Sequence, residues 1–230
     1  MPVKTVLTTE EIEKMIGTAR CQRDQVIMQF YSETGVRESE LLSVLVENID
    51  FDQHTVLIPH LKAGAKKHCP KCNHVAGRKT QWCSHCGISL KDVEAEGVLT
   101  RNRIITLSDE LIDLLRDFTQ GMELHDRVIK LSRQAIYNII REMASEVGLQ
   151  GKCILNPDTG RKQYVHPHIL RASLAVDWLK IAGGDINKQK ALQEQLGHSS
   201  FDTTMRYNKL APSQVRKVAD EVQQLRFKRK

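Results

Sequence analysis

Four cysteines lie close together in the middle of the chain, in a segment with few apolar residues of its own. They form two Cys-x-x-Cys pairs, Cys69/Cys72 and Cys83/Cys86, within 18 residues. Two β-rich stretches, 54–61 and 102–107, flank this segment. A structureless connection of about 40 residues is uncommon inside a compact domain, whereas a metal ion can fold such a connection locally. The sequence therefore predicts a β-hairpin that carries a metal-bound insertion at 64–98.

The cysteine pairs predict a zinc site rather than disulfides. No apolar run approaches the ~18 residues of a membrane span, and the N-terminus has no signal-peptide pattern. We therefore expect a cytoplasmic protein, in which thiols stay reduced. Two such pairs suit the tetrahedral shell of a structural zinc ribbon, with iron or a redox disulfide pair as the alternative. Because four thiolates leave no open position for water, we expect one structural Zn²⁺ and no catalytic role for it.

Helical periodicity dominates the rest of the chain. A capping box at Thr8 and Glu11 opens the first predicted helix, and another begins near Arg37 with apolar residues that continue to Val46. Caps and periodicity together predict helices at 9–18, at 25–31, from 37 onward, after Ser108, after Ser132, and at about 167–181, 188–196, 200–208 and 212–226. The expected fold is mostly α with a small antiparallel β-sheet, an α+β class.

The positive charge is concentrated around the cysteines. The chain has a formal net charge of +6. Between 60 and 103 there are nine Lys or Arg and three acids, so this segment accounts for all of it. Such a local basic patch is typical of nucleic-acid binding, with a merely solvated loop as the alternative. The candidate DNA contacts are Lys66, Lys67, Arg78, Lys79, Arg101 and Arg103.

Three separate segments carry residues that suit a phosphodiester. In 34–41, TGVRESEL, Arg37 can hold two phosphate oxygens while Glu40, about one turn on, fixes its guanidinium. In 166–171, HPHILR, His168 and Arg171 share one helix face, which places a proton-transfer group beside a cation. In 196–207, LGHSSFDTTMRY, a histidine precedes Tyr207 by nine residues. Singly, each of these residues is more often a surface, capping or packing residue.

Together and in this order, the three segments resemble the motifs of the tyrosine recombinases of the phage-integrase and Xer type. The resemblance covers the catalytic domain, over nearly all of 8–226 except the insertion at 64–98. It implies the tyrosine recombinase catalytic-domain fold over 1–230, with a zinc-ribbon-like insertion in a β-hairpin. The family usually has an N-terminal core-binding domain, which we do not expect here. It also often has a histidine where this chain has Ala172.

The resemblance also implies a role for each candidate residue. Tyr207 is expected to attack the scissile phosphate and form a 3′-phosphotyrosine, so that strands are rejoined without ATP or a catalytic cofactor. His168 is the expected base, and a lysine of the β-hairpin the expected general acid. Lys62 fits that lysine best, with Lys66 and Lys67 as rivals. The groups expected to bind the phosphate oxygens and stabilise the transition-state charge are Arg37, Arg171 and His198, with Glu40 in support.

The leading hypothesis is a site-specific recombinase or integrase of a mobile element. A type IB topoisomerase shares the chemistry, and a non-catalytic zinc-containing DNA-binding module is the alternative from another class. The resemblance implies a double-stranded recombination site as partner, a homotetramer on DNA, association with the nucleoid and no membrane contact.

Overall fold

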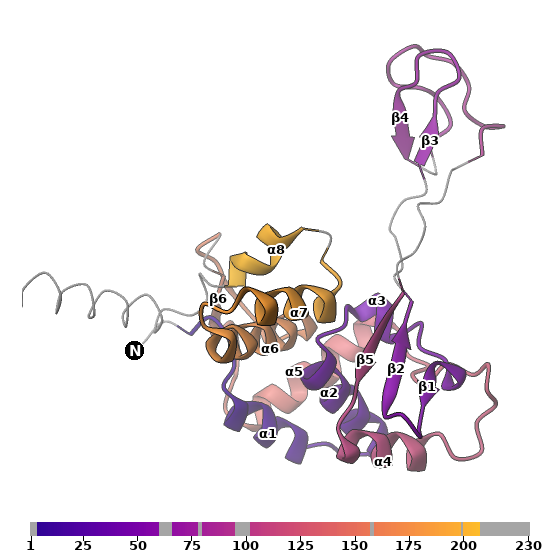
Figure 1. Ribbon diagram of the computed structural model, residues 1–230. Coiled ribbons are helices and arrows are strands. Elements are labelled where there is room, and N and C mark those ends of the chain that lie inside the picture. Colours follow the sequence, from indigo (N-terminus) through magenta and orange to yellow (C-terminus); the bar gives the residue numbers. More distant parts are fainter. Residues whose placement is uncertain are drawn as a thin grey trace, which may run out of the picture. The chain divides into compact units, whose positions relative to one another are not determined.

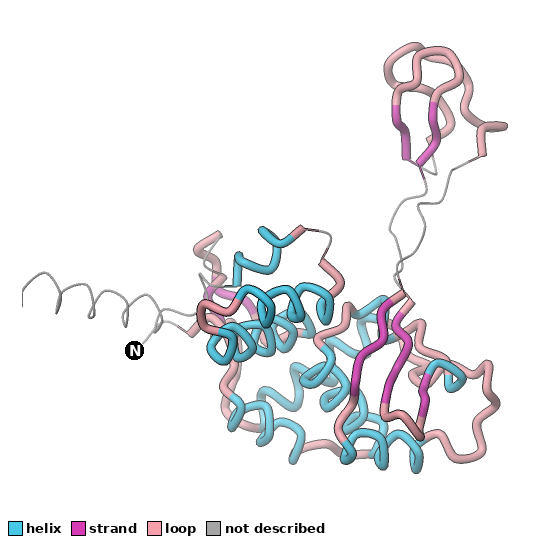
Figure 2. The backbone as a smooth tube through the Cα atoms, viewed as in Figure 1, coloured by secondary structure: helices cyan, strands magenta, loops and turns pink. Residues whose placement is uncertain are grey.

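The computed structural model describes residues 4–59, 66–77, 80–94, 102–156, 159–198 and 200–207. The chain separates into two compact units. Unit 1 comprises Met1–Ile58 and Arg103–Lys230, and unit 2 comprises Pro59–Asn102. Helices dominate unit 1, beside a small antiparallel sheet (Figures 1 and 2), which confirms the α+β class. Among the described residues, no helix is long and apolar enough to cross a membrane.

The sheet of unit 1 has three strands in the order β1-β2-β5. β1 is Ile49–Asp50, β2 is Thr55–Ile58 and β5 is Arg103–Thr106, and both pairings are antiparallel. Val56 lies opposite Ile105, and both side chains are buried, whereas Ile104 is 70% exposed. Alternate residues therefore face the core, as expected for a sheet covered on one side. The pairing of β2 with β5 confirms the predicted hairpin on either side of the insertion.

Unit 1 contains eight α-helices among its described residues. They are α1 (Thr9–Gly17), α2 (Gln22–Thr34), α3 (Glu38–Leu41), α4 (Asp109–Phe118), α5 (Arg133–Glu146), α6 (Pro167–Ala182), α7 (Ile186–Leu196) and α8 (Phe201–Met205). Short strands β6 (Ile154–Leu155) and β7 (Lys162–Gln163) pair with each other. The predicted caps Thr8, Ser108 and Ser132 each accept the expected backbone hydrogen bond. The helix predicted at 212–226 lies outside the described residues.

Two apolar clusters meet at α6. The larger contains α2, the sheet and one end of α6, including Ile169 and Leu170. The smaller contains the following turns of α6, from Ala172 to Leu179, with Leu192 and Leu196 of α7. Because α6 packs against both clusters, most of its residues are apolar and buried, and its exposed residues are confined to His168 near its start and Lys180 and Ile181 near its end. This arrangement places the first turn of α6, with His168 and Arg171, where the two clusters meet.

The prediction of one continuous helix from Arg37 through Val46 is wrong. α3 ends at Leu41, and a separate 3-10 turn, η1, covers Val46–Asn48. The backbone N–H and the side-chain hydroxyl of Ser43 both donate to the carbonyl of Glu40, at 3.0 and 2.7 Å. Leu45 then forms an isolated β-bridge with Arg127. Serine hydroxyls compete for backbone groups in this way, and a pairing with a distant segment overrides the local apolar period.

Unit 2 contains a small β-hairpin and two cysteine knuckles. Its strands, β3 (Lys66–His68) and β4 (Val75–Gly77), are antiparallel, and Trp82 forms a second bridge with Ser89. Each Cys-x-x-Cys pair lies in a tight turn, in which the N–H of Asn73 donates to Cys69 and that of Gly87 to Cys83. Among the described residues of the unit, the buried members of its apolar cluster are Cys69, Ala76, Cys83 and Leu90. So small an apolar core needs a further stabilising element.

Gly35 ends α2 in the left-handed conformation, at φ +59°. A Cβ added there would lie 2.9 Å from the Cδ2 atoms of Leu174 and Leu196. Gly35→Ala should therefore lower the free energy of unfolding by about 2–4 kcal/mol, from backbone strain and overpacking together. Chemical denaturation measures this, with Gly148→Ala as control. Gly148 has φ +84° and nothing within 4 Å, so only strain of about 1 kcal/mol is expected. Equal losses in the two variants would contradict the overpacking.

Candidate active site and metal centre

Five of the six residues predicted to act on a phosphodiester meet around one pocket of unit 1, and the sixth, Lys62, lies outside the described residues. Arg37 is the N-cap of α3, and His168 and Arg171 lie in the first turns of α6. His198 follows the glycine that ends α7, and Tyr207 follows α8. The pocket has a volume of about 510 Å³, and all five side chains line it. Segments from distant parts of the sequence thus form one site, as the motifs predicted.

Arg171 is the anchor of the pocket. It is 2% exposed. One Nη atom donates to the carbonyl of Gly35, and the other donates to the carbonyl of Leu196 at 2.7 Å. Burial lowers the pKa of Arg171, while the neighbouring Tyr207 acts in the opposite direction. The side chain therefore ties the end of α2 to the end of α7 and remains a fixed cation beside the tyrosine.

Arg37 and Glu40 form the pair that the sequence predicted. The Arg37 Nη1 lies 2.9 Å from Glu40 Oε1, and the Arg37 backbone N–H donates to Oε2 at 2.7 Å. The Glu40 side chain is 2% exposed, whereas that of Arg37 is 40% exposed. Burial works against ionisation of Glu40, but hydrogen bonds and charge from Arg103, and then from Arg37, bring its pKa to about 2. The carboxylate is thus charged at neutral pH and leaves one face of Arg37 open to the pocket.

His198 lies between Arg171 and Tyr207. Its Nε2 is 2.8 Å from Arg171 Nη2 and its Nδ1 is 2.8 Å from the hydroxyl of Thr204. Because arginine can only donate, Nε2 accepts and Nδ1 carries the proton. The Tyr207 ring stacks on the imidazole, with 5.9 Å between centroids. Burial and the charges of Arg171 and Arg37 lower the pKa of His198 to about 3. The ring is therefore neutral in the absence of an anion.

His168 extends into the pocket from the start of α6. Its side chain is exposed, and its backbone N–H donates to Nδ1 of the N-cap, His166. Loss of hydration in the pocket and the nearby charges of Arg171 and Arg37 lower the pKa of His168. A neutral imidazole that borders open space can accept a proton, as the expected base must.

The titration of His166 makes the stability of the fold depend on pH, and a variant can isolate this effect. Burial, and then His168, lower its pKa to about 4 from 6.5. The unfolded chain then binds more protons, so stability falls as pH drops from about 6.5 towards 4. His166→Asn keeps a capping side chain but cannot titrate. Between pH 7.5 and pH 5, the wild type should lose about 1 kcal/mol more of its free energy of unfolding than His166→Asn loses, after allowance for solvent screening.

Urea unfolding at several pH values measures these losses. The lost stacking of His166 on Tyr137 lowers stability equally at each pH, so the difference between the two pH values isolates the titration. Parallel curves for wild type and His166→Asn would contradict it.

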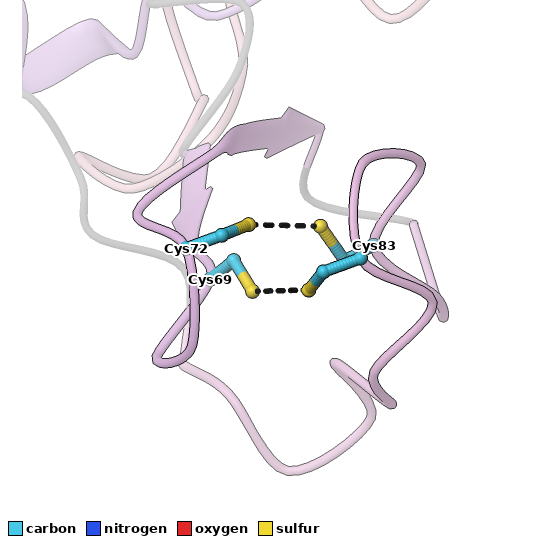
Figure 3. Close-up of side chains that lie close together, drawn as sticks. Cys69, Cys72 and Cys83 are labelled. Atoms are coloured by element: carbon cyan, nitrogen blue, oxygen red, sulfur yellow. Dashed lines mark hydrogen bonds between the residues drawn. The ribbon is translucent and has the colours of Figure 1, made fainter.

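The four cysteines of unit 2 face one another (Figure 3). Their sulfur atoms all lie within 4.8 Å of one another, and Cys69–Cys86 and Cys72–Cys83 are 3.4 and 3.6 Å apart. Tetrahedral Zn²⁺ with Zn–S bonds of about 2.3 Å requires sulfurs about 3.8 Å apart. All four thiols are free, and Cys69 and Cys83 are buried. The donor set and its spacing therefore fit one four-coordinate metal ion.

Two of the candidate DNA contacts have other partners. Lys67 is 9% exposed, and its Nζ donates to the carbonyl of Leu90 inside unit 2. The Arg103 side chain is 10% exposed and is paired with Glu40. Both side chains are thus bound within the protein rather than presented to DNA phosphates, whereas Lys66 is exposed. The remaining candidate contacts, Arg78, Lys79 and Arg101, lie outside the described residues, as does Lys62, the expected general acid.

Sequence reasoning missed several groups that line or support the pocket. Thr204 is fully buried and holds His198, and the carbonyl of Gly35 fixes Arg171. Thr5, Asn156 and Gln163 reach the pocket from elements with no catalytic motif. Thr204 lies inside the third motif, where its position six residues after His198 is a usable signal. The others carry no local signal, because only the fold brings them to the site.

Comparisons with known proteins agree on one family. The model of the phage integrase family matches residues 5–214. The chain is 24% identical to tyrosine recombinase XerA of Saccharolobus solfataricus, over 90% of this chain and 52% of that protein. It is 27% identical to tyrosine recombinase XerD of Staphylococcus aureus, over 95% and 59%. The chain thus spans about half to three-fifths of the length of these relatives.

Solved structures show the same fold. A crystal structure of XerA recombinase matches with a TM-score of 0.62 at 21% identity, covering 100% of this chain and 66% of that one. A post-cleavage complex of XerH site-specific recombinase with its palindromic difH substrate matches with a TM-score of 0.61 at 18% identity, over 94% and 53%. The catalytic domain of bacteriophage HP1 integrase matches with a TM-score of 0.54 at 17% identity, over 98% and 95%.

Proposed function

The chain belongs to the phage integrase family, and from this premise we propose that it is a site-specific DNA recombinase that cleaves and rejoins DNA through Tyr207. The observation that carries the proposal is the pocket of unit 1. Tyr207 borders it together with Arg37, His168, Arg171 and His198, so a nucleophile, a base and two cations face one space. The substrate proposed is a double-stranded recombination site, and the palindromic difH substrate bound by XerH supports this choice.

The chemistry follows from the groups around the pocket. A phosphodiester bound by Arg37 and Arg171 places its phosphorus before the Tyr207 oxygen, and His168 takes the phenolic proton. The tyrosine oxygen bonds to phosphorus as the bond to the 5′-oxygen breaks, which gives a 3′-phosphotyrosine and a 5′-hydroxyl. Lys62, the proposed acid, supplies the proton to that 5′-oxygen. Fixed cations stabilise the charge that develops on phosphorus oxygens, and the reverse sequence rejoins the strands.

A bound phosphate also changes the protonation of His168 and His198. In its absence, burial and the charges of Arg171 and Arg37 lower the pKa of both His168 and His198. A bound anion offsets those charges, and its oxygens offer an acceptor for an N–H. We therefore propose that, as DNA binds, Arg171 Nη2 exchanges its bond to His198 Nε2 for one to a phosphate oxygen. Nε2 of His198 then gains a proton and donates it in a hydrogen bond to the phosphate, with Thr204 holding the other nitrogen. His168 stays neutral until it accepts the phenolic proton.

For unit 2 we propose a zinc-ribbon-like subdomain at 64–98 with one structural Zn²⁺ on its four cysteines. The spacing of the sulfurs supports this, and a closed thiolate shell gives the ion a folding role. The proposal keeps 1–230 as a recombinase catalytic domain that needs no catalytic cofactor. Lys66, Lys71 and Lys91 are exposed in unit 2, and Lys91 lies over the exposed ring of Trp82. These groups support a proposed contact with DNA phosphates.

Assembly and location remain proposals of the same kind. We propose that the protein assembles as a homotetramer on two duplex sites, associates with the nucleoid in the cytoplasm and belongs to a mobile element; the DNA-bound XerH structure supports the association with DNA.

Covalent capture tests the proposed function. The protein is incubated with a random library of nicked duplexes, stopped with detergent, and the DNA attached to protein is sequenced. A nick near the cut releases the short 5′-hydroxyl strand, so the phosphotyrosine accumulates. One enriched sequence is the expected result and supplies the core site. Capture without enrichment would point to a topoisomerase, and DNA binding without capture would contradict the enzyme.

A further inference from the structure

One arginine outside the three motifs contacts two elements of the pocket at once. Arg103 opens β5, and its side chain is 10% exposed. Its Nη1 and Nη2 donate to the two oxygens of Glu40, at 3.1 and 2.8 Å. Its Nε donates to the carbonyl of Gln195 at 3.0 Å. The guanidinium thus uses a bidentate pair on one side and a backbone bond on the other.

Each of these partners leads to a phosphate-binding group. Glu40 also holds the backbone and the guanidinium of Arg37. Gln195 lies in the last turn of α7, and Gly197 and His198 come soon after it. Arg37 donates to the carbonyl of the same Gly197, at 3.4 Å. Arg103 therefore supports Arg37 through Glu40, and it also supports the turn that precedes His198.

The packing at Gly197 shows how closely this turn is fitted to Arg103. Gly197 has φ +64°, and a Cβ there would lie 2.7 Å from Arg103 Nη1. The contact is to the guanidinium itself, so a side chain at 197 would have to displace the group that holds Glu40. The path of the backbone into His198 and the position of Arg103 thus depend on each other.

We propose that Arg103 is a positioning residue, which holds Arg37 through Glu40 and the turn before His198 in the geometry that binds the scissile phosphate. The inference rests on the proposed function and assigns Arg103 a role other than direct DNA contact. A planar guanidinium suits it, because a lysine at 103 would have one point charge for two carboxylate oxygens and a carbonyl. The low pKa of Glu40 supports the same arrangement, because the hydrogen bond and the charge of Arg103 are the largest of the effects that lower it.

The test compares four variants in single-turnover cleavage of a nicked duplex: Arg103→Met, Arg103→Lys, Glu40→Gln and the double variant Arg103→Met/Glu40→Gln. Arg20→Met is the matched control, because Arg20 also pairs with two carboxylates, those of Glu142 and Glu146, but is 67% exposed. Circular dichroism and thermal melting identify any variant that does not fold. The double variant has no unpaired buried carboxylate, so it keeps the test informative if Arg103→Met unfolds.

Arg103→Met should slow adduct formation at saturating DNA about 100-fold, the scale of a misplacement of about 1 Å in a reacting group. Arg103→Lys should recover part of that rate. The double variant should be no slower than the slower single variant, because Arg103 acts through Glu40. The salt dependence of DNA affinity should match that of wild type and Arg20→Met, because every cation that contacts a phosphate is still present. A phosphate contact would instead reduce the salt slope by about one, and that result, or an unchanged rate, would overturn the inference.

A second measurement separates this inference from the proposed function. Inorganic phosphate is titrated into each folded variant, and the NMR signals of the Arg37 guanidinium and the His198 ring report its binding. Arg103→Met should bind phosphate at least about tenfold more weakly than Arg20→Met, as expected when one charged contact is misplaced. If wild type forms no adduct, the proposed function fails, and equal phosphate binding in the two variants would then overturn the role of Arg103 as well.

Discussion

Tyr207→Phe should abolish the covalent protein–DNA product and leave DNA binding intact. Tyr207 is 8% exposed, and its ring packs on His198. Phenylalanine keeps that packing and removes only the oxygen that bonds to phosphorus. Loss of a nucleophile from a covalent enzyme lowers its rate on the order of 10⁶-fold, so no adduct should be detectable. Denaturing gel electrophoresis of labelled nicked duplex measures the adduct, and a gel-shift assay measures binding.

Tyr164→Phe is the matched control for this variant. Tyr164 is 39% exposed, lies under Arg141 and lines a different pocket from Tyr207. It should form the adduct at the wild-type rate. An adduct that persists in Tyr207→Phe would mean that another residue is the nucleophile. Loss of DNA binding along with the adduct would instead mean that the hydroxyl serves the structure of the pocket.

Removal of the metal should unfold unit 2 and leave unit 1 folded. Among the described residues, the apolar cluster of unit 2 has four buried members, two of which are the proposed ligands Cys69 and Cys83. Structural zinc sites of this type contribute on the order of 10 kcal/mol of apparent binding free energy at neutral pH. So small a core has no comparable source of stability. Unit 1 has its own large apolar cluster, which contains none of the four ligands.

Hydrogen exchange of the full chain, read by peptide, measures this effect. Chelation, or Cys72→Ser, should remove protection from 66–94 and leave protection in α2 and α6 unchanged. Cys153→Ser is the control, because Cys153 is a free cysteine outside the cluster. Metal analysis of the native protein should find one zinc per chain. Protection in 66–94 that survives chelation, or a content of iron, would contradict a structural zinc ion.

Much of the fold and of the pocket could be predicted because the signals are local. Helix caps such as Thr8 and Ser132 act on backbone groups three residues away, so they are legible in the sequence. The three motifs predicted Arg37, His168, Arg171, His198 and Tyr207 as site residues, and the structure places all five around one pocket. The cysteine spacing likewise predicted four metal ligands, and their sulfurs lie within ligand distance.

What the sequence determined by itself is therefore most of the helices, the two strands on either side of the insertion, the motif residues and the candidate ligands. The end of α3 at Leu41 and the shorter strands depended on pairing between segments in the folded chain. Only the tertiary structure decided which charges pair. Arg103 and Lys67 lie in the basic segment and resemble DNA contacts there, but one pairs with Glu40, 63 residues away, and the other with a carbonyl of its own unit. The physical reason is how far apart in the sequence the interacting groups lie. Caps and periodicity depend on near neighbours, whereas the partner of a charged group depends on which distant segments the core brings within about 3 Å.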